Sequence, residues 1–227
     1  GEALGGVGGL DLGDGADLTW IYVQEEDAAA THLSQLNVRL GAQARLTILS
    51  LNCGGRLVRR EIDIMSRGAE SDISIRGVNL VGGDSHVDVT TVLLHDAPGV
   101  TASEIFRNVA TARGSGVFQG QIRVAQEAQK TDARMACNTL LLSDEAEFFA
   151  KPELEIFADD VQCAHGATVT DILDDHLFYL MSRGIGPKQA RSMLVQAFVQ
   201  EVFDAVEDDT VREALDGRIE NWLERNG

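Results

Sequence analysis

The sequence is poor in positive charge. Lysine and arginine together number 19 against 36 acidic residues, which gives a formal net charge of −17. A chain this acidic repels the phosphate backbone of nucleic acids and the anionic lipids of a membrane surface, and no cluster of basic and aromatic residues offsets the repulsion locally. We therefore expect neither nucleic acid nor membrane among its partners.

Cysteine is scarce as well. The three cysteines, Cys53, Cys137 and Cys163, are odd in number and far apart, which argues against a disulfide framework and favours a reducing, cytoplasmic compartment. No apolar run reaches the length of a membrane-spanning helix, and no charged-then-apolar leader precedes the fold. Because the chain opens at Gly1 within a Gly-rich stretch, we expect it to be a piece of a longer protein.

Most of the chain shows the two-residue alternation of β-strands, as in Leu46 and Ile48 on either side of Thr47. Residues 1–16 are the exception, since glycine dominates them, and they indicate a linker or a loosely held edge. Segments that begin near residues 73, 87, 103, 117 and 134 recur every 14 to 17 residues. The predicted strands are 18–23, 33–40, 46–51, 57–64, 73–80, 87–94, 103–109, 117–124, 134–142 and 154–158.

This regular spacing, with few Asn-Gly or Asp-Gly hairpin turns, favours a mainly β parallel β-helix, a solenoid of coiled strands. The low aromatic content of 5% suits a narrow interior filled by stacked aliphatic side chains. A β-sandwich stays open as an alternative, because short, evenly spaced strands serve it too. Glycines between the strands, such as Gly41, Gly68 and Gly114, are expected where a turn needs a positive φ.

The helical period begins at Asp174, where Leu177, Phe178, Leu180 and Met181 form one stripe. The helix is expected to end at Gly184, a C-terminal cap. A second helix is predicted from Pro187 to about Val206, and Asp208 with Asp209 is expected to cap a last one. The predicted domains are a Gly-rich segment (1–16), a β-helix core (17–166) and a small C-terminal helical domain (167–227).

Two residues at the junction of strands and helices could carry chemistry. If residues 161–165 are extended, Cys163 and His165 point to the same side, and a thiol and an imidazole can bind zinc, iron or an iron-sulfur cluster. Two ligands do not close a site, and a buried thiol beside a hydrogen-bonded histidine is the plainer explanation. Cys137, on a strand with Met135, is interpreted as a core cysteine unless it lies near His165.

Sequence motifs of enzymes are missing. The glycine pairs at 82–83 and 114–116 lack the Lys-Ser/Thr of a phosphate loop, and no Gly-x-Ser-x-Gly occurs. The sequence therefore predicts neither a nucleotide site nor a serine nucleophile.

Six segments near the junction carry a family resemblance: Leu140-Leu141-Leu142-Ser143, Lys151-Pro152-Glu153-Leu154-Glu155-Ile156, Ala158-Asp159-Asp160-Val161, Cys163-Ala164-His165-Gly166-Ala167-Thr168-Val169, Leu177-Phe178-Tyr179-Leu180 and Ser182-Arg183-Gly184-Ile185. These segments closely resemble the SufB/SufD family of the SUF iron-sulfur cluster assembly system. At the centre of the resemblance, this chain has Ala164-His165-Gly166-Ala167 where SufB has Glu-His-Glu-Ala, which favours the SufD branch.

The resemblance implies a right-handed parallel β-helix followed by a small helical domain. It also implies a scaffold, not an enzyme, that pairs with SufB, carries the SufC ATPase and holds iron or an iron-sulfur cluster only transiently. His165 matches the histidine implicated in cluster assembly and is a candidate metal ligand, with Cys163 beside it. The SufC-docking part corresponds to the helices at 172–206 and includes Leu177, Phe178, Tyr179, Arg183 and Gly184.

One departure concerns Cys137. It stands 28 residues before His165, the separation expected in SufB between a functional cysteine and the equivalent histidine. Either it is a harmless core substitution, which we favour, or this chain holds a more self-sufficient pair.

Two other functions are weighed against the scaffold. A polysaccharide-acting β-helix enzyme would need clustered Asp with Arg or Lys and an export signal, and neither is found. An architectural β-helix that pairs end to end is the third hypothesis. In isolation a homodimer is expected, because the unpaired backbone N–H and C=O groups of an open strand edge can hydrogen-bond to a second copy.

Overall fold

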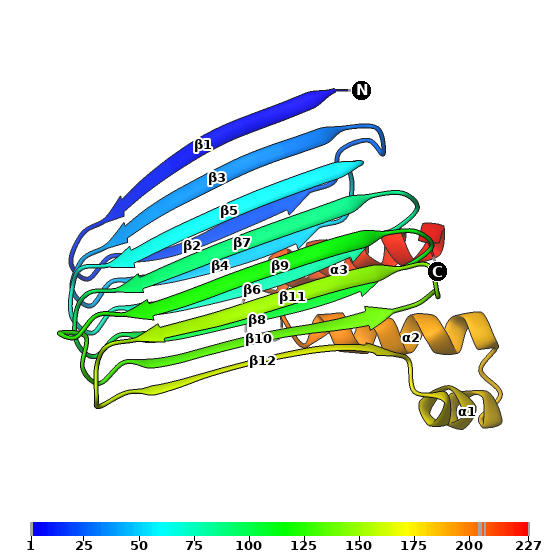
Figure 1. The fold of residues 1–227 in the computed structure, drawn as a ribbon. Coiled ribbons are helices and arrows are strands. Elements are labelled where there is room, and N and C mark those ends of the chain that lie inside the picture. The colour runs from blue at the N-terminus through cyan, green and yellow to red at the C-terminus, as the bar shows by residue number, and fades with distance from the viewer. Residues whose placement is uncertain (1, 204–205, 207, 227) are drawn as a thin grey trace.

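The computed structural model describes residues 2–203, 206 and 208–226, and its strands form a two-sided coil. Odd-numbered strands make one parallel six-stranded sheet (sheet A, order β1-β3-β5-β7-β9-β11) and even-numbered strands another (sheet B, order β12-β10-β8-β6-β4-β2). The chain crosses from one sheet to the other after every strand (Figure 1). The strands are β1 (Ala3–Leu12), β2 (Asp17–Gln24), β3 (Thr31–Leu40), β4 (Arg45–Asn52), β5 (Leu57–Ser66), β6 (Asp72–Val81), β7 (His86–His95), β8 (Thr101–Ala110), β9 (Ser115–Val124), β10 (Asp132–Leu141), β11 (Glu147–Ile156) and β12 (Gln162–Asp171).

Each residue lies beside the residue one coil later, so side chains stack in columns. Leu36, Ile62 and Thr91 form one such column in sheet A. Alternate residues of each strand point into the coil, as in β7, where Val89 and Leu93 are completely buried. Parallel pairing throughout the described strands confirms the predicted β-helix and makes the β-sandwich alternative, an antiparallel fold, wrong.

The turns between strands also repeat from coil to coil. Gln43, Glu70 and Lys130 occupy one turn position with φ of 56°, 59° and 65°, and Gly99 has 72° there. The Gln43 amide donates to the Ala69 carbonyl of the next turn at 2.8 Å, so the turns are bonded to one another. Backbone pairing thus holds non-glycine residues in the left-handed region, and the expected link between glycine and positive φ holds at only some turns.

Gly68 and Gly41 are turn glycines of another kind, because neither has a positive φ. A β-carbon on Gly68 would lie 1.9 Å from the Ala42 nitrogen in the neighbouring turn. Glycine is required at Gly68 because two stacked turns approach closely and leave no room for a β-carbon. The predicted reason for a glycine here, a positive φ, was wrong.

The strand region differs from the prediction in two places. The Gly-rich segment 1–16 is not a linker but contains β1, an exposed edge strand that pairs with β3 along its whole length, in line with the expected edge. β11 begins at Glu147 rather than near residue 154, and it includes Pro152. Because β11 is an edge strand of sheet A, the missing amide hydrogen of proline is tolerated there.

Three helices follow the strands in the described part of the chain: α1 (Asp174–Ser182), α2 (Pro187–Gln200) and α3 (Asp209–Asn226). Pro187 is the first residue of α2, as predicted, and the Asp208 carboxylate accepts hydrogen bonds from the amides of Thr210 (2.8 Å) and Val211 (3.2 Å). The predicted end of α2 near Val206 is wrong, since the helix stops at Gln200. None of these helices is long and apolar enough to cross a membrane.

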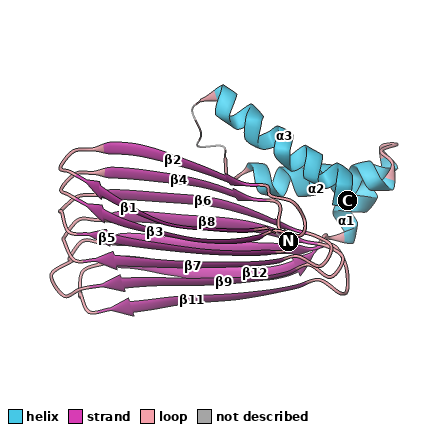
Figure 2. Ribbon diagram, turned by 90° about the horizontal axis from the view of Figure 1, so that it is seen from above, coloured by secondary structure: helices cyan, strands magenta, loops and turns pink. Residues whose placement is uncertain are grey.

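The apolar side chains form two cores. The first fills the interior of the coil. The second lies between the outer face of sheet B and helices α2 and α3, where Leu49, Val78 and Val109 meet Val199 and Trp222. Figure 2 shows the helices gathered at one side of the solenoid while the outer face of sheet A stays bare. The helical region therefore shares a core with the β-helix, and β12 continues past the expected boundary at residue 166.

Candidate functional site

The last coil of the solenoid is open. β11 and β12 each pair with only one other strand, so nothing in the described chain continues either sheet beyond them (Figure 1). Open strand edges and an uncovered interior face are surfaces that bind partners. This end carries the residues that the sequence singled out.

Cys163 and His165 point to the same side of β12, as predicted, and the structure shows that this side is the interior face. Cys163 is the register partner of Ala133 and His165 that of Met135, and both of those residues are buried. Cys163 is half-buried and contacts the interior core, and this burial raises the pKa of its thiol. His165 faces the same way but is exposed, because no further coil covers it.

Cys137 lies one strand below, on the same face. Its register partner is Ala167, so His165 is its diagonal neighbour on the interior face. Cys137 is completely buried. Burial raises the pKa of its thiol to about 12, although a hydrogen bond from the Asn108 amide to its sulfur (3.3 Å) acts in the other direction. The thiol is therefore protonated at neutral pH.

A ladder of asparagine amides leads to this thiol through the interior. Asn52 donates to Asn79 and Asn79 to Asn108, each at 2.7 Å. Asn108 in turn donates to the carbonyl oxygen of Asn138 at 3.3 Å, and a carbonyl can only accept. That contact fixes the direction of the whole ladder, so every amide N–H points towards Cys137. The sequence carried a signal for the ladder, namely asparagines spaced 27 and 29 residues apart.

Glu104 is a second buried polar group that sequence reasoning missed. It lies on the interior face of β8 beside Met135, which separates it from His165. Glu104 is completely buried, and neither carboxylate oxygen has a hydrogen-bond partner. Burial raises the pKa of this carboxyl to about 7. The Thr91 hydroxyl, which is close but not in hydrogen-bonding geometry, opposes the shift. A group with this pKa exchanges protons near neutral pH.

The described residues by themselves offer an incomplete set of metal ligands. Among the described residues, no group of three or more His, Cys, Asp or Glu side chains could hold a metal ion. The thiol of Cys163 and the imidazole of His165 could supply two ligands at the open end, and a structural site needs about four. Any metal bound here would therefore need ligands from elsewhere.

Helix α1 presents the residues that were predicted to bind a partner. It has no buried residue, and Phe178 and Tyr179 are 74% and 55% exposed. Leu177 is half-buried. The Arg183 guanidinium lies 5.0 Å from the centre of the Tyr179 ring, and Gly184 ends the helix with a φ of 88°. An exposed apolar surface of this kind is typical of a binding site for another protein.

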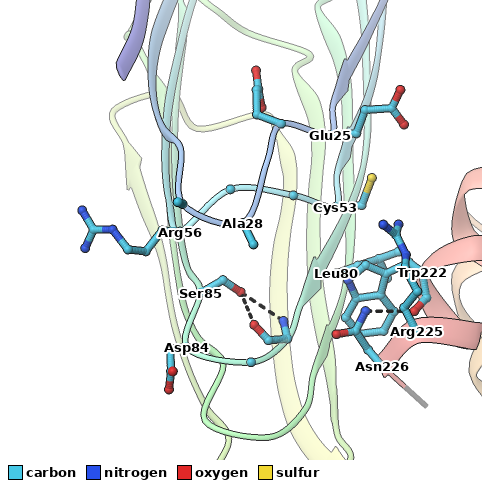
Figure 3. A pocket seen from close by; sticks show the side chains of 16 residues that line it. Glu25, Ala28, Cys53, Arg56, Leu80, Asp84, Ser85, Trp222, Arg225 and Asn226 are labelled. Atoms are coloured by element: carbon cyan, nitrogen blue, oxygen red, sulfur yellow. Dashed lines mark hydrogen bonds between the residues drawn. The ribbon is translucent and has the colours of Figure 1, made fainter. Parts of the chain in front are cut away.

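A pocket that the sequence did not predict lies elsewhere on the chain. It has a volume of about 540 Å³ and is formed by the loops after β2, β4 and β6 and by the last turn of α3 (Figure 3). Cys53 in this pocket is buried, donates to the Gln24 carbonyl at 3.4 Å and has a pKa raised by burial to about 11. The pocket contains no residue of β10, β11, β12 or α1, so it is separate from the open end.

Curated relatives of the chain are proteins of iron-sulfur cluster assembly. The chain is 33% identical to "Iron-sulfur cluster assembly protein SufD" of Escherichia coli over 92% of its own length and 50% of that protein. It is 30% identical to "Protein ABCI7, chloroplastic" of Arabidopsis thaliana over 92% of its length and 44% of that protein. A SufBD family protein of Synechocystis is 29% identical over 88% of the chain. The chain spans about half the length of the curated relatives it matches.

The family model described as "SUF system FeS cluster assembly, SufBD core domain" matches residues 3–198. The match covers the whole described β-helix, together with α1 and most of α2. The fold, the resemblance at Ala164-His165-Gly166-Ala167 and these similarities agree, and the chain belongs to the SufB/SufD family of the SUF iron-sulfur cluster assembly system.

Proposed function

We propose that this protein is a scaffold subunit of the SUF complex that pairs with SufB and carries the SufC ATPase. The observation that supports the proposal most directly is the place of His165, exposed on the interior face of the last, open coil. A partner strand that extends β11 or β12 would lie beside this imidazole. The subunit would act as a binding surface and not as an enzyme.

In this proposal the cargo at the open end is iron or a nascent iron-sulfur cluster. His165 serves as a ligand or a proton-handling group, and Cys163 supplies a thiol from the same strand face. Cys137 lies behind Ala167, so it could contribute only after the open end rearranges. Because the described residues supply too few ligands, SufB would complete the site, and the cargo would leave without becoming a tightly bound cofactor.

The role of His165 can be tested in a complex reconstituted with SufB and SufC. The variant His165→Ala is expected to lose most of the cluster formation, followed by the visible absorbance of the cluster. His86→Ala is the matched control, because His86 lies on the outer face of sheet A, where it contacts Ser115. Cluster formation at the normal rate in His165→Ala would refute the role of this residue.

Docking of SufC is proposed for the exposed face of α1. Phe178 and Tyr179 would enter the interface, Leu177 would support them, and Arg183 would lie at its edge beside the cap at Gly184. ATP hydrolysis in SufC would then act on the β-helix through α2, which shares a core with sheet B.

A pull-down with SufC tests this docking surface. The double variant Phe178→Asp, Tyr179→Asp is expected to abolish capture of SufC. Phe149→Asp is the control, since Phe149 is 63% exposed on the outer face of sheet A, which the helices do not cover (Figure 2). Equal capture by both variants would place the SufC contact elsewhere.

The three cysteines are free, which supports a reducing, cytoplasmic location.

In the absence of SufB, the edges of β11 and β12 would pair with a second copy. Size-exclusion chromatography with light scattering is expected to show a homodimer that SufB converts into a heterodimer.

A further inference from the structure

Arg60 is a buried arginine without a counter-ion. It lies on the interior face of β5, is 5% exposed and forms no ion pair with any described residue. Its guanidinium carbon stacks 3.2 Å from the centre of the Tyr22 ring, which places the charge between the two sheets. A buried cation that lacks an anionic partner is costly, so its surroundings need an explanation.

Glu26, the acidic side chain whose charge acts on Arg60, is already hydrogen-bonded to other groups. Glu26 acts on Arg60 only through its field, while its carboxylate accepts hydrogen bonds from His32 (2.8 Å) and Gln24. His32 also bonds the Tyr22 hydroxyl at 2.5 Å. Glu26, His32 and Tyr22 therefore satisfy one another. Among the described residues, Arg60 contacts the Tyr22 side chain directly, and no carboxylate forms an ion pair with it.

The unsatisfied polar groups around Arg60 include several donors. The Nε and Nη2 groups of Arg60 are buried and have no acceptor. The hydroxyls of Ser34 and Ser50 are also buried and unpartnered. Ser34 is the register partner of Arg60 in sheet A, and Ser50 is that of Tyr22 in sheet B, so all of these groups face the interior of the same two coils.

We propose that this cluster binds one small monovalent inorganic anion of about the size of chloride. The guanidinium supplies the positive charge and two N–H donors, and the hydroxyls of Ser34 and Ser50 add two more. A single small ion would satisfy donors that the protein itself leaves open. The site is independent of the open end and of the assembly function proposed above.

Bromide is the probe, because it replaces chloride and scatters X-rays anomalously. Crystals soaked in sodium bromide are expected to show an anomalous peak within hydrogen-bonding distance of the Arg60 guanidinium. In solution, the melting temperature is expected to rise with sodium bromide and to saturate, relative to sodium gluconate at equal ionic strength.

Arg60→Met keeps most of the side-chain volume, removes the charge, and is expected to abolish this anion dependence. Arg59→Met is the matched control, because the neighbouring Arg59 lies on the outer face and is paired with Glu61 and Asp88. Ser50→Ala should weaken bromide binding severalfold and serves as a second variant if Arg60→Met fails to fold. An ordered water and no bromide beside Arg60, or a bromide effect that survives in Arg60→Met, would overturn the proposal.

Discussion

His165 lies directly beside Met135 in the β10–β12 ladder, and Met135 lies beside Glu104 in the β8–β10 ladder. One column of the interior face thus runs from an exposed imidazole, through a thioether, to a buried carboxyl. The interior next to the open end therefore contains an ionisable carboxyl among its apolar side chains.

Glu104 should make the stability of the protein depend on pH. Its folded pKa of about 7 lies above the ordinary 4.5, so the folded state favours the protonated form. This contribution is fully present below pH 4.5 and is lost as the pH rises to 7, a change of roughly 3 kcal/mol at 1.36 kcal/mol per unit. Glu104→Gln is therefore expected to be more stable than the native protein at pH 8 and about equally stable at pH 4.5, measured by urea unfolding.

The control for this experiment is Glu61→Gln, on the outer face of β5, where the carboxylate pairs with Arg59. That variant should show no gain in stability between pH 4.5 and 8. A stability difference between Glu104→Gln and the native protein that stays constant across this range would contradict the assigned ionisation.

The amide ladder should be a strong stabilising element. Asn79→Leu removes two hydrogen bonds of 2.7 Å and leaves the amide of Asn52 and the carbonyl of Asn108 unsatisfied. We expect a loss of about 2 to 4 kcal/mol in the free energy of unfolding. Asn37→Leu, at an exposed position of β3, should change it by less than about 0.5 kcal/mol. Equal effects of the two changes would show that the ladder contributes nothing.

Gly77 should be irreplaceable because of the ring beside it. A β-carbon at this position would lie 2.2 Å from the Phe106 ring, whereas one at Gly6 would meet open space. Gly77→Ala is expected to cost about 1 to 3 kcal/mol and Gly6→Ala almost nothing, by chemical denaturation. Adding Phe106→Leu should recover part of the loss at Gly77, and strictly additive effects would argue against this contact.

The three thiols should differ in reactivity. Cys163 is half-buried, while Cys53 and Cys137 are buried with pKa values raised to about 11 and 12. A disulfide reagent at pH 8 should label one thiol rapidly in the folded protein and three after unfolding. Cys163→Ser should remove the rapid phase, and rapid labelling of Cys137 in that variant would contradict its burial behind Ala167.

Local patterns predicted most of the fold. Alternation and even spacing identified the coiled strands, and Pro187 and Asp208 marked the starts of helices correctly, because these signals act over a few neighbouring residues. β11 was placed too late because Lys151 and Pro152 interrupt its alternation. Its strand geometry comes instead from pairing with β9, which only the folded coil provides.

The candidate site at the open end was predicted only in part, because local patterns reveal neighbours within a strand but not neighbours between coils. The two-residue period within one strand placed Cys163 and His165 on one face. The nearness of Cys137 depends on the length of a coil, which alternation within a strand does not reveal. Glu104 and Arg60 were missed because buried charges violate the rule that inward positions are apolar, and only the structure shows which polar residues the interior accepts.

The stacking of side chains in columns makes the coil the natural unit of evolutionary length change in this protein. Loss of one residue inside β6 would turn the rest of that strand inside out and send Asn79 to the surface. Loss of the entire coil that contains Asn79 would instead bring Asn52 beside Asn108. The hydrogen-bonded row of amides would then stay continuous, with one member fewer.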